Sequence, residues 1–132
     1  MTVPVLSRIL MVEDEPDIQT VAQLALEAVG GFLVQTSSSG NEALMVAPTF
    51  APDLILLDVM MPDMDGPSTL QALRANPQTS HIPIIFMTAK IQSHEIARYI
   101  ALGALDVIAK PFDPMALSAT VGTIWNNQYG RN

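Results

Sequence analysis

The sequence predicts an α/β fold, a doubly wound five-stranded parallel sheet with helices on both faces. Two observations predict it. Five short apolar runs alternate with five segments of helical spacing. The run Leu54–Leu57 is apolar without alternation, which is typical of a strand covered on both sides. The length of 132 residues fits one domain, which we expect at residues 6–126, with a frayed tail at 127–132.

Cap and turn residues delimit the elements of the first half of the chain. Pro16 predicts the start of a helix, because its missing N–H costs nothing at the first helical position, and Gly30-Gly31 predicts its end. Ser39 and Glu42 have the spacing of a capping box, and we expect their helix to end before Pro48. The expected strands are 8–13, 32–36 and 54–57, and the expected helices are 16–29 and 39–47.

The second half continues the same alternation. Pro83 is tolerable near the start of a strand, and Gly103 closes a helix. Asp113 and Pro114 are typical of an N-cap and a first helical residue. The expected strands are 82–87 and 106–109, and the expected helices are 67–75, 93–102 and 113–126.

Composition excludes several classes of function. A net charge of -7 would repel a phosphate backbone, so we expect no direct nucleic-acid binding. The absence of cysteine excludes thiol catalysis and a thiolate metal site. Residues 1–8 lack a basic leader, and the apolar segment after them is too short to cross a membrane. We therefore expect a soluble cytoplasmic protein.

Polar and charged residues stand where four of the five expected strands end. Because ligands of an open parallel sheet bind beyond the carboxyl ends of its strands, these residues form the candidate site. The second strand offers only a threonine and serines, as expected of an edge strand. The candidate residues are Glu13 and Asp14 after the first strand, Asp58 after the third, Thr88 after the fourth and Lys110 after the fifth.

These side chains suit phosphoryl transfer. Three crowded carboxylates need a cation, and oxygen ligands without histidine or cysteine favour a partly hydrated Mg2+. Lys110 suits a bound phosphoryl group as a point charge, and Thr88 could donate a hydrogen bond to the same group. Asp58, on a central strand, is then the best-placed nucleophile, because an ionised carboxylate can form an acyl phosphate.

Each of these residues also has a simpler explanation. Asp58 could cap the loop that follows it, and Glu13 and Asp14 could favour the positive end of a helix dipole. Lys110 could be a solvated lysine before a turn, and Thr88 a hydroxyl at a strand end. Taken one at a time, each simpler explanation is as good as the functional one. The coincidence of all of them at one edge of the sheet is a much poorer explanation than a functional site.

Four motifs in order resemble the receiver domain of bacterial response regulators, of the single-domain chemotaxis type. Together they span nearly the whole chain, and their order and spacing are specific although each alone is weak. The motifs are Ile-Leu-Met-Val-Glu-Asp-Glu-Pro (9–16), Leu-Ile-Leu-Leu-Asp-Val-Met-Met-Pro-Asp-Met-Asp-Gly (54–66), Pro-Ile-Ile-Phe-Met-Thr-Ala (83–89) and Gly-Ala-Leu-Asp-Val-Ile-Ala-Lys-Pro-Phe (103–112).

The resemblance implies a flavodoxin-like (βα)5 fold with strand order 2-1-3-4-5. It implies that Asp58 accepts a phosphoryl group from a sensor histidine kinase or a histidine phosphotransfer protein in a phosphorelay. Asp14, Asp58 and the backbone carbonyl of Met60 would ligate Mg2+, while Glu13 acts largely through water.

The resemblance also implies how the domain switches. Lys110 would pair with the phosphoryl group, and Thr88 would move toward it on activation. The Lys110-Pro111 peptide would be cis. The family usually has an aromatic residue three positions before the lysine, and here that position is Val107. The position of Met60, two residues after the phosphoacceptor, tunes the access of hydrolytic water in this family.

The leading hypothesis is thus a phosphorylation-dependent switch that binds a downstream protein and is not a turnover enzyme. A Mg2+-dependent phosphatase is a competing hypothesis, although such enzymes usually have an aspartate where this chain has Met60. A flavin-binding protein and a docking module that is never phosphorylated are further alternatives. The sequence leaves the kinase, the downstream partner and a homodimer open.

Overall fold

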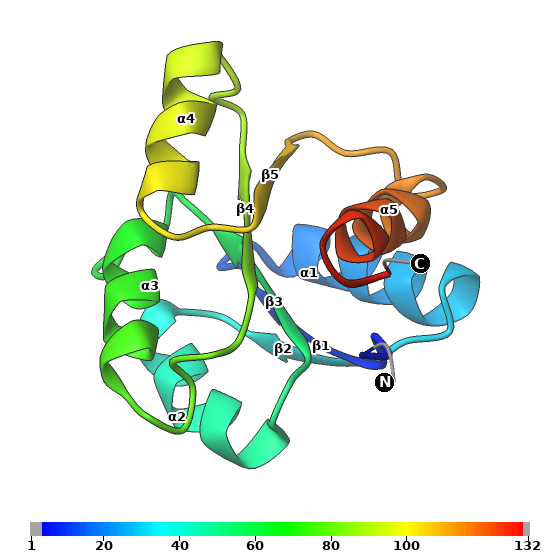
Figure 1. Ribbon diagram of the computed structural model, residues 1–132. Helices are drawn as coiled ribbons and strands as arrows, with labels where there is room; N and C mark the ends of the chain where they lie inside the picture. Colours follow the sequence, from blue (N-terminus) through cyan, green and yellow to red (C-terminus); the bar gives the residue numbers. More distant parts are fainter. Residues whose placement is uncertain (1–3, 131–132) are drawn as a thin grey trace.

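The computed structural model describes residues 4–130 and shows one five-stranded sheet between two layers of helices (Figure 1). Every neighbouring pair of strands is parallel, and the order is β2-β1-β3-β4-β5. The expected fold class and strand order are confirmed. The strands are β1 (Arg8–Val12), β2 (Leu33–Ser37), β3 (Leu54–Asp58), β4 (Ile84–Thr88) and β5 (Asp106–Ala109).

The helices divide between the two faces of the sheet (Figure 1). Alternate strand residues enter the two cores: Leu10 and Ile55 pack on one face, and Ile9 and Leu56 on the other. The first core is closed by α2 (Gly40–Phe50), α3 (Gly66–Ala75) and α4 (Ser93–Ala101). The second is closed by α1 (Pro16–Leu24), its continuation η1 (Ala25–Val29) and α5 (Leu117–Tyr129).

The first helix is not α-helical to its end, as the sequence had suggested. Its last turns, Ala25–Val29, form a π-helix. The Ser118 hydroxyl of α5 donates a hydrogen bond of 3.0 Å to the carbonyl of Ala25, where the geometry changes. A side chain that enters the hydrogen-bond ladder of a helix is a known cause of such irregularity. The predicted stop is confirmed, because Gly31 adopts a left-handed φ of 71°.

The expected end of the second helix before Pro48 is wrong. Pro48 lies inside α2, which continues to Phe50 and ends where Ala51 adopts a left-handed φ of 53°. Ala47 and Phe50 are buried in the core, and their packing offsets the hydrogen bond that proline cannot donate. The predicted cap is confirmed, because the Ser39 hydroxyl accepts the N–H of Glu42 at 3.0 Å.

The last helix lies later in the chain than expected. The Asp113 carboxylate does accept the N–H of Met115 at 2.9 Å, but this contact closes a turn, and α5 begins only at Leu117. The helix then continues to Tyr129, whose ring packs on Trp125 with centroids 4.4 Å apart. Residues 127–129 are therefore helical, although the sequence suggested a frayed tail.

The other predicted boundaries agree with the structure to within one or two residues. Residues 131–132 of the expected tail and residues 1–3 of the segment searched for a leader lie outside the described residues. Within residues 4–130, no helix combines the length and apolarity needed to cross a membrane.

Candidate functional site

The candidate site residues lie at one edge of the sheet because the strands end level with one another. The registers place Val12 opposite Leu57 and Asp58 opposite Met87. The residues that complete or directly follow these strands therefore meet beyond the same edge. Those residues are Glu13, Asp14, Asp58, Thr88 and Lys110, as expected from the sequence.

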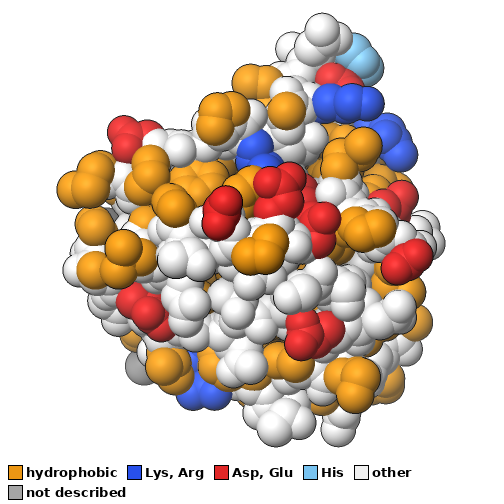
Figure 2. Space-filling view, turned by 180° about the vertical axis from the view of Figure 1, so that it is seen from behind, with side chains coloured by type: hydrophobic (Ala, Val, Ile, Leu, Met, Phe, Trp, Pro, Cys, Tyr) orange, Lys and Arg blue, Asp and Glu red, His pale blue; other side chains and the backbone are white. Residues whose placement is uncertain are grey.

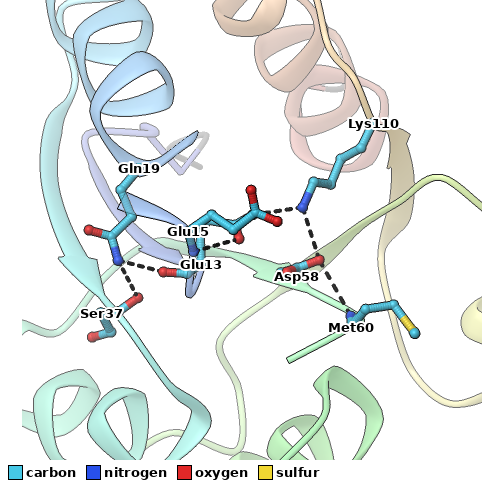
Figure 3. Close-up of polar contacts among 7 residues, drawn as sticks. All are labelled: Glu13, Glu15, Gln19, Ser37, Asp58, Met60 and Lys110. Carbon is cyan, nitrogen blue, oxygen red and sulfur yellow. Dashed lines mark hydrogen bonds and ion pairs between the residues drawn. The ribbon is translucent and has the colours of Figure 1, made fainter. Parts of the chain in front are cut away.

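Lys110 joins two buried carboxylates (Figure 3). Its Nζ lies 2.7 Å from Oε1 of Glu13 and 3.2 Å from Oδ1 of Asp58. Glu13 has an exposed fraction of 0% and Asp58 of 3%, so both acids have lost nearly all contact with water. The ammonium group supplies the positive charge that such acids need when they are buried as anions.

Asp14 completes an oxygen-rich cluster. Glu13, Asp14 and Asp58 each offer one carboxylate oxygen, and these oxygens lie within 4.8 Å of one another. Octahedral Mg2+ holds its ligands at about 2 Å, which places ligand oxygens roughly 3–4 Å apart. Small side-chain adjustments would bring the cluster to that spacing. The donor set therefore fits Mg2+.

Burial is the largest influence on the pKa values of the two buried acids, Glu13 and Asp58. It raises both pKa values, although Lys110 opposes the rise in each. Burial also disfavours the charged form of Lys110, but its contacts with Glu13 and Asp58 outweigh this and raise the pKa of Lys110. The lysine thus only partly offsets the cost of two buried carboxylates, and a divalent cation would offset more of it.

This electrostatic arrangement predicts a pH dependence of stability in the absence of divalent cations. An acid whose pKa is raised on folding binds its proton more tightly in the folded state, so the free energy of unfolding falls as pH rises through that interval. The interval begins at the ordinary pKa values, 4.5 for Glu13 and 3.8 for Asp58, and extends upward. Urea unfolding measured across this pH interval should show that the free energy of unfolding falls more steeply with rising pH in wild type than in Glu13→Gln. Parallel curves for the two proteins would contradict the prediction.

Met60 and Thr88 make weaker connections to the site. The N–H of Met60 points at Oδ1 of Asp58 over 3.4 Å, and Met60 is 66% exposed. Thr88 is buried, and its hydroxyl accepts the N–H of Lys90 at 3.1 Å. The Thr88 carbonyl accepts the N–H of Lys110 at 3.0 Å. Among the described residues, no hydrogen bond joins the Thr88 hydroxyl to Asp58 or to the side chain of Lys110. The Lys110-Pro111 peptide is cis, as expected.

Sequence reasoning missed two residues that shape the site. The amide of Gln19 on α1 donates to the carbonyl of Glu13 (Figure 3). The sequence showed only a polar residue on the first helix. A Cβ on Gly66 would lie 2.7 Å from the carbonyl oxygen of Asp58, so the backbone passes there with no room for a side chain. The sequence marked Gly66 only as a loop residue.

Acidic side chains gather on one face of the molecular surface, beside a basic side chain and flanked by hydrophobic ones (Figure 2). A hollow of about 220 Å³ lies next to Lys110, and its wall is mostly apolar. Its lining residues are Asp17, Ile18, Val21, Lys110, Pro111 and Phe112.

Comparison with known families and proteins agrees with this geometry. The family model of the response regulator receiver domain matches residues 9–122. The alkaline phosphatase synthesis transcriptional regulatory protein PhoP of Bacillus subtilis is 43% identical over 117 residues, which are 89% of this chain and 48% of PhoP. A probable cyclic di-GMP phosphodiesterase of Vibrio cholerae is 32% identical over 94% of this chain and 28% of its own length. The chain thus spans about half or less of the curated relatives it matches.

Solved structures extend the likeness to three dimensions. The chemotaxis response regulator CheY4 of Vibrio cholerae superposes with a TM-score of 0.83 at 30% identity, covering 91% of this chain and 99% of CheY4. A response regulator from Desulfuromonas acetoxidans gives a TM-score of 0.81 at 30% identity, over 93% of this chain and 99% of its own. The sheet order, the acidic edge and the family match agree, and the chain belongs to the response regulator receiver domain family.

Proposed function

We propose that this chain is a signalling switch of a two-component system, in which Asp58 accepts a phosphoryl group in a Mg2+-dependent reaction. One observation carries the proposal: the buried carboxylate of Asp58 contacts the ammonium group of Lys110 and shares an oxygen cluster with Glu13 and Asp14. This combination provides a nucleophile together with a positive charge and a metal site beside it.

Each residue has a distinct proposed role. Asp14, Asp58 and the backbone carbonyl of Met60 would hold Mg2+, and Glu13 would act largely through water. The metal supplies charge neutralisation on the phosphoryl oxygens. An oxygen of Asp58 would attack phosphorus in line while the bond from phosphorus to the donor's histidine nitrogen breaks. The bonding electron pair stays on that imidazole nitrogen, and imidazole is a good leaving group, so this chain need not supply a general acid.

Two further residues respond to the new phosphoryl group in this proposal. Lys110 pairs with it, exchanging its present contact with Asp58 at 3.2 Å for a phosphoryl oxygen. Thr88 donates a hydrogen bond to it through its O–H, which is free to donate because the hydroxyl oxygen only accepts from the N–H of Lys90. Val107 is half-buried and packs against the core beside α4, so the switch would work there without an aromatic ring.

We propose a sensor histidine kinase or histidine phosphotransfer protein as the donor. The apolar hollow formed by Ile18, Val21 and Phe112 borders Lys110, so a protein docked there would bring its phosphohistidine close to Asp58. The recipient of the signal is a further protein, and we propose a cytoplasmic location and no direct nucleic-acid contact by this chain. We propose no turnover activity, because Met60 stands where a phosphatase of similar topology has its general acid.

The proposal is tested with acetyl phosphate as a small phosphoryl donor. We expect intact mass to increase by one phosphoryl group in wild type with Mg2+, and not in Asp58→Asn or after chelation. Asn keeps the size of the side chain and removes the nucleophile. Absence of any gain in wild type would favour a docking module that is never phosphorylated. Rapid, continuous phosphate release would favour the phosphatase.

Met60 should influence how long the phosphoryl group remains. The thioether cannot hydrogen-bond a water as an amide can, so Met60→Asn should shorten the lifetime of the acyl phosphate severalfold. The decay of phosphorylated protein after removal of acetyl phosphate measures it. Met45→Asn is the control, because Met45 on α2 is also exposed, at 79%, but does not adjoin Asp58. An unchanged decay rate in Met60→Asn would contradict a role of Met60 in the lifetime of the acyl phosphate.

A further inference from the structure

We propose that Gln19 is a positioning residue for the metal ligand Asp14. This inference rests on the proposed function, because it assigns Gln19 a role in assembling the Mg2+ site. Gln19 does not belong to the acidic cluster and would not touch the ion. It acts through the backbone that carries two of the three acids.

The side chain of Gln19 bridges two loops at the edge of the sheet (Figure 3). Its Nε2 donates to the carbonyl of Glu13, which follows β1. The same nitrogen lies 3.1 Å from the Ser38 hydroxyl and 3.5 Å from the Ser37 carbonyl, at the end of β2. The loop after β1 is thereby tied both to α1 and to the neighbouring strand.

The contact with the Glu13 carbonyl fixes the peptide that joins Glu13 to Asp14. The N–H of Glu13, which belongs to the preceding peptide, already donates to the Ser37 carbonyl at 3.0 Å. The two peptides on either side of the Glu13 Cα are therefore both anchored once Gln19 is in place. A peptide group is planar, and fixing its carbonyl therefore also fixes the direction in which the chain enters Asp14.

Asp14 depends on this anchor more than Glu13 does. The Glu13 carboxylate is held directly, by Lys110 at 2.7 Å and by the N–H of Glu15 at 3.1 Å. Among residues 4–130, no hydrogen bond or ion pair holds the carboxylate of Asp14, which is half-buried. Its position before the metal binds is therefore set by its backbone. Residues that orient a metal ligand from behind typically change metal affinity when they are replaced.

The test substitutes Gln19→Met, which keeps the length of the side chain and removes its donors. Isothermal titration of the unphosphorylated protein with Mg2+ should show an affinity about tenfold weaker than wild type. The rate of phosphorylation by acetyl phosphate at saturating Mg2+ should stay close to the wild-type rate. A merely structural role would lower that rate or the yield of folded protein without a selective change in Mg2+ affinity.

Two further variants make the result specific. Gln23→Met carries the same change one turn later on α1 and should bind Mg2+ like wild type. Within residues 4–130, the only hydrogen bond of the Gln23 side chain is to Glu27. Gln19→Glu keeps the shape of the side chain but replaces the donating amide with a carboxylate, which cannot donate a hydrogen bond to the Glu13 carbonyl. Its added negative charge alone would strengthen Mg2+ binding, so weaker binding identifies the lost hydrogen bond as the cause.

The outcomes separate this inference from the proposed function. If wild type binds no Mg2+ and gains no phosphoryl group, the proposed function itself fails. If wild type binds Mg2+ and both Gln19 variants bind it equally well, Gln19 has no positioning role although the proposed function stands. Weaker binding in both Gln19 variants and unchanged binding in Gln23→Met support the inference.

Discussion

Replacing Lys110 with methionine should lower the free energy of unfolding by about 3 kcal/mol near neutral pH without divalent cations. The change leaves Glu13 and Asp58 without the ammonium group that contacts both of them. Both side chains are buried, so water cannot replace the lost partner. Removing one member of a buried ion pair costs far more than removing an exposed charge. Urea unfolding measures the difference.

Two controls isolate the cause of this loss. Lys90→Met removes an exposed lysine that has no ion pair within the described residues, and it should change stability by less than about 0.5 kcal/mol. The double variant Glu13→Gln/Lys110→Met should recover part of the loss, because it removes one of the two stranded charges. A loss below about 1 kcal/mol in Lys110→Met would mean that the buried ion pairs are weak.

Gly66→Ala should disturb both stability and phosphorylation. An added Cβ would lie 2.7 Å from the Asp58 carbonyl oxygen and 2.8 Å from the Val59 Cα. Both are backbone atoms, so neither can turn aside as a flexible side chain would, and the end of β3 must shift. Overpacking of this kind costs about 1–3 kcal/mol. Because the shift moves Asp58 itself, the rate of phosphorylation by acetyl phosphate should fall by about tenfold or more.

Gly122→Ala is the matched control for this prediction. Gly122 lies within α5, and beyond the adjacent residues and backbone of its own helix a Cβ there would meet no atom within 4 Å. Alanine is the better helix former, so this variant should gain up to about 1 kcal/mol and keep its phosphorylation rate. Equal behaviour of Gly66→Ala and wild type would show that the backbone at Asp58 yields easily, contrary to the tight fit seen here.

The arrangement of the site was predictable because it follows from topology. Once five apolar strands alternate with helices, their carboxyl ends share one edge, and Asp58 and Lys110 must approach each other although 52 positions separate them. Element boundaries were less predictable where tertiary packing overrode local signals. Pro48 should end a helix, yet the buried side chains around it keep α2 intact.

Contacts that side chains make with the backbone could not be predicted from the sequence, for a related reason. Gln19 looks like any polar residue on a helix surface, and only the folded loop shows that its amide meets the Glu13 carbonyl. Gly66 looks like an ordinary turn glycine, and only the close passage of β3 shows why no larger residue fits. The Ser118 contact that accompanies the π-helix joins residues 93 positions apart, which no local pattern can reveal.

The central claim is that the acyl phosphate forms on Asp58 and on no other acid. Hydride reduction converts an acyl phosphate, but not a free carboxylate, into an alcohol, and peptide mass spectrometry then locates the modified residue. After treatment with acetyl phosphate and Mg2+, we expect homoserine at position 58 and unmodified aspartate at position 14. Reduction at another acid, or at none in protein that has gained phosphoryl mass, would contradict the account.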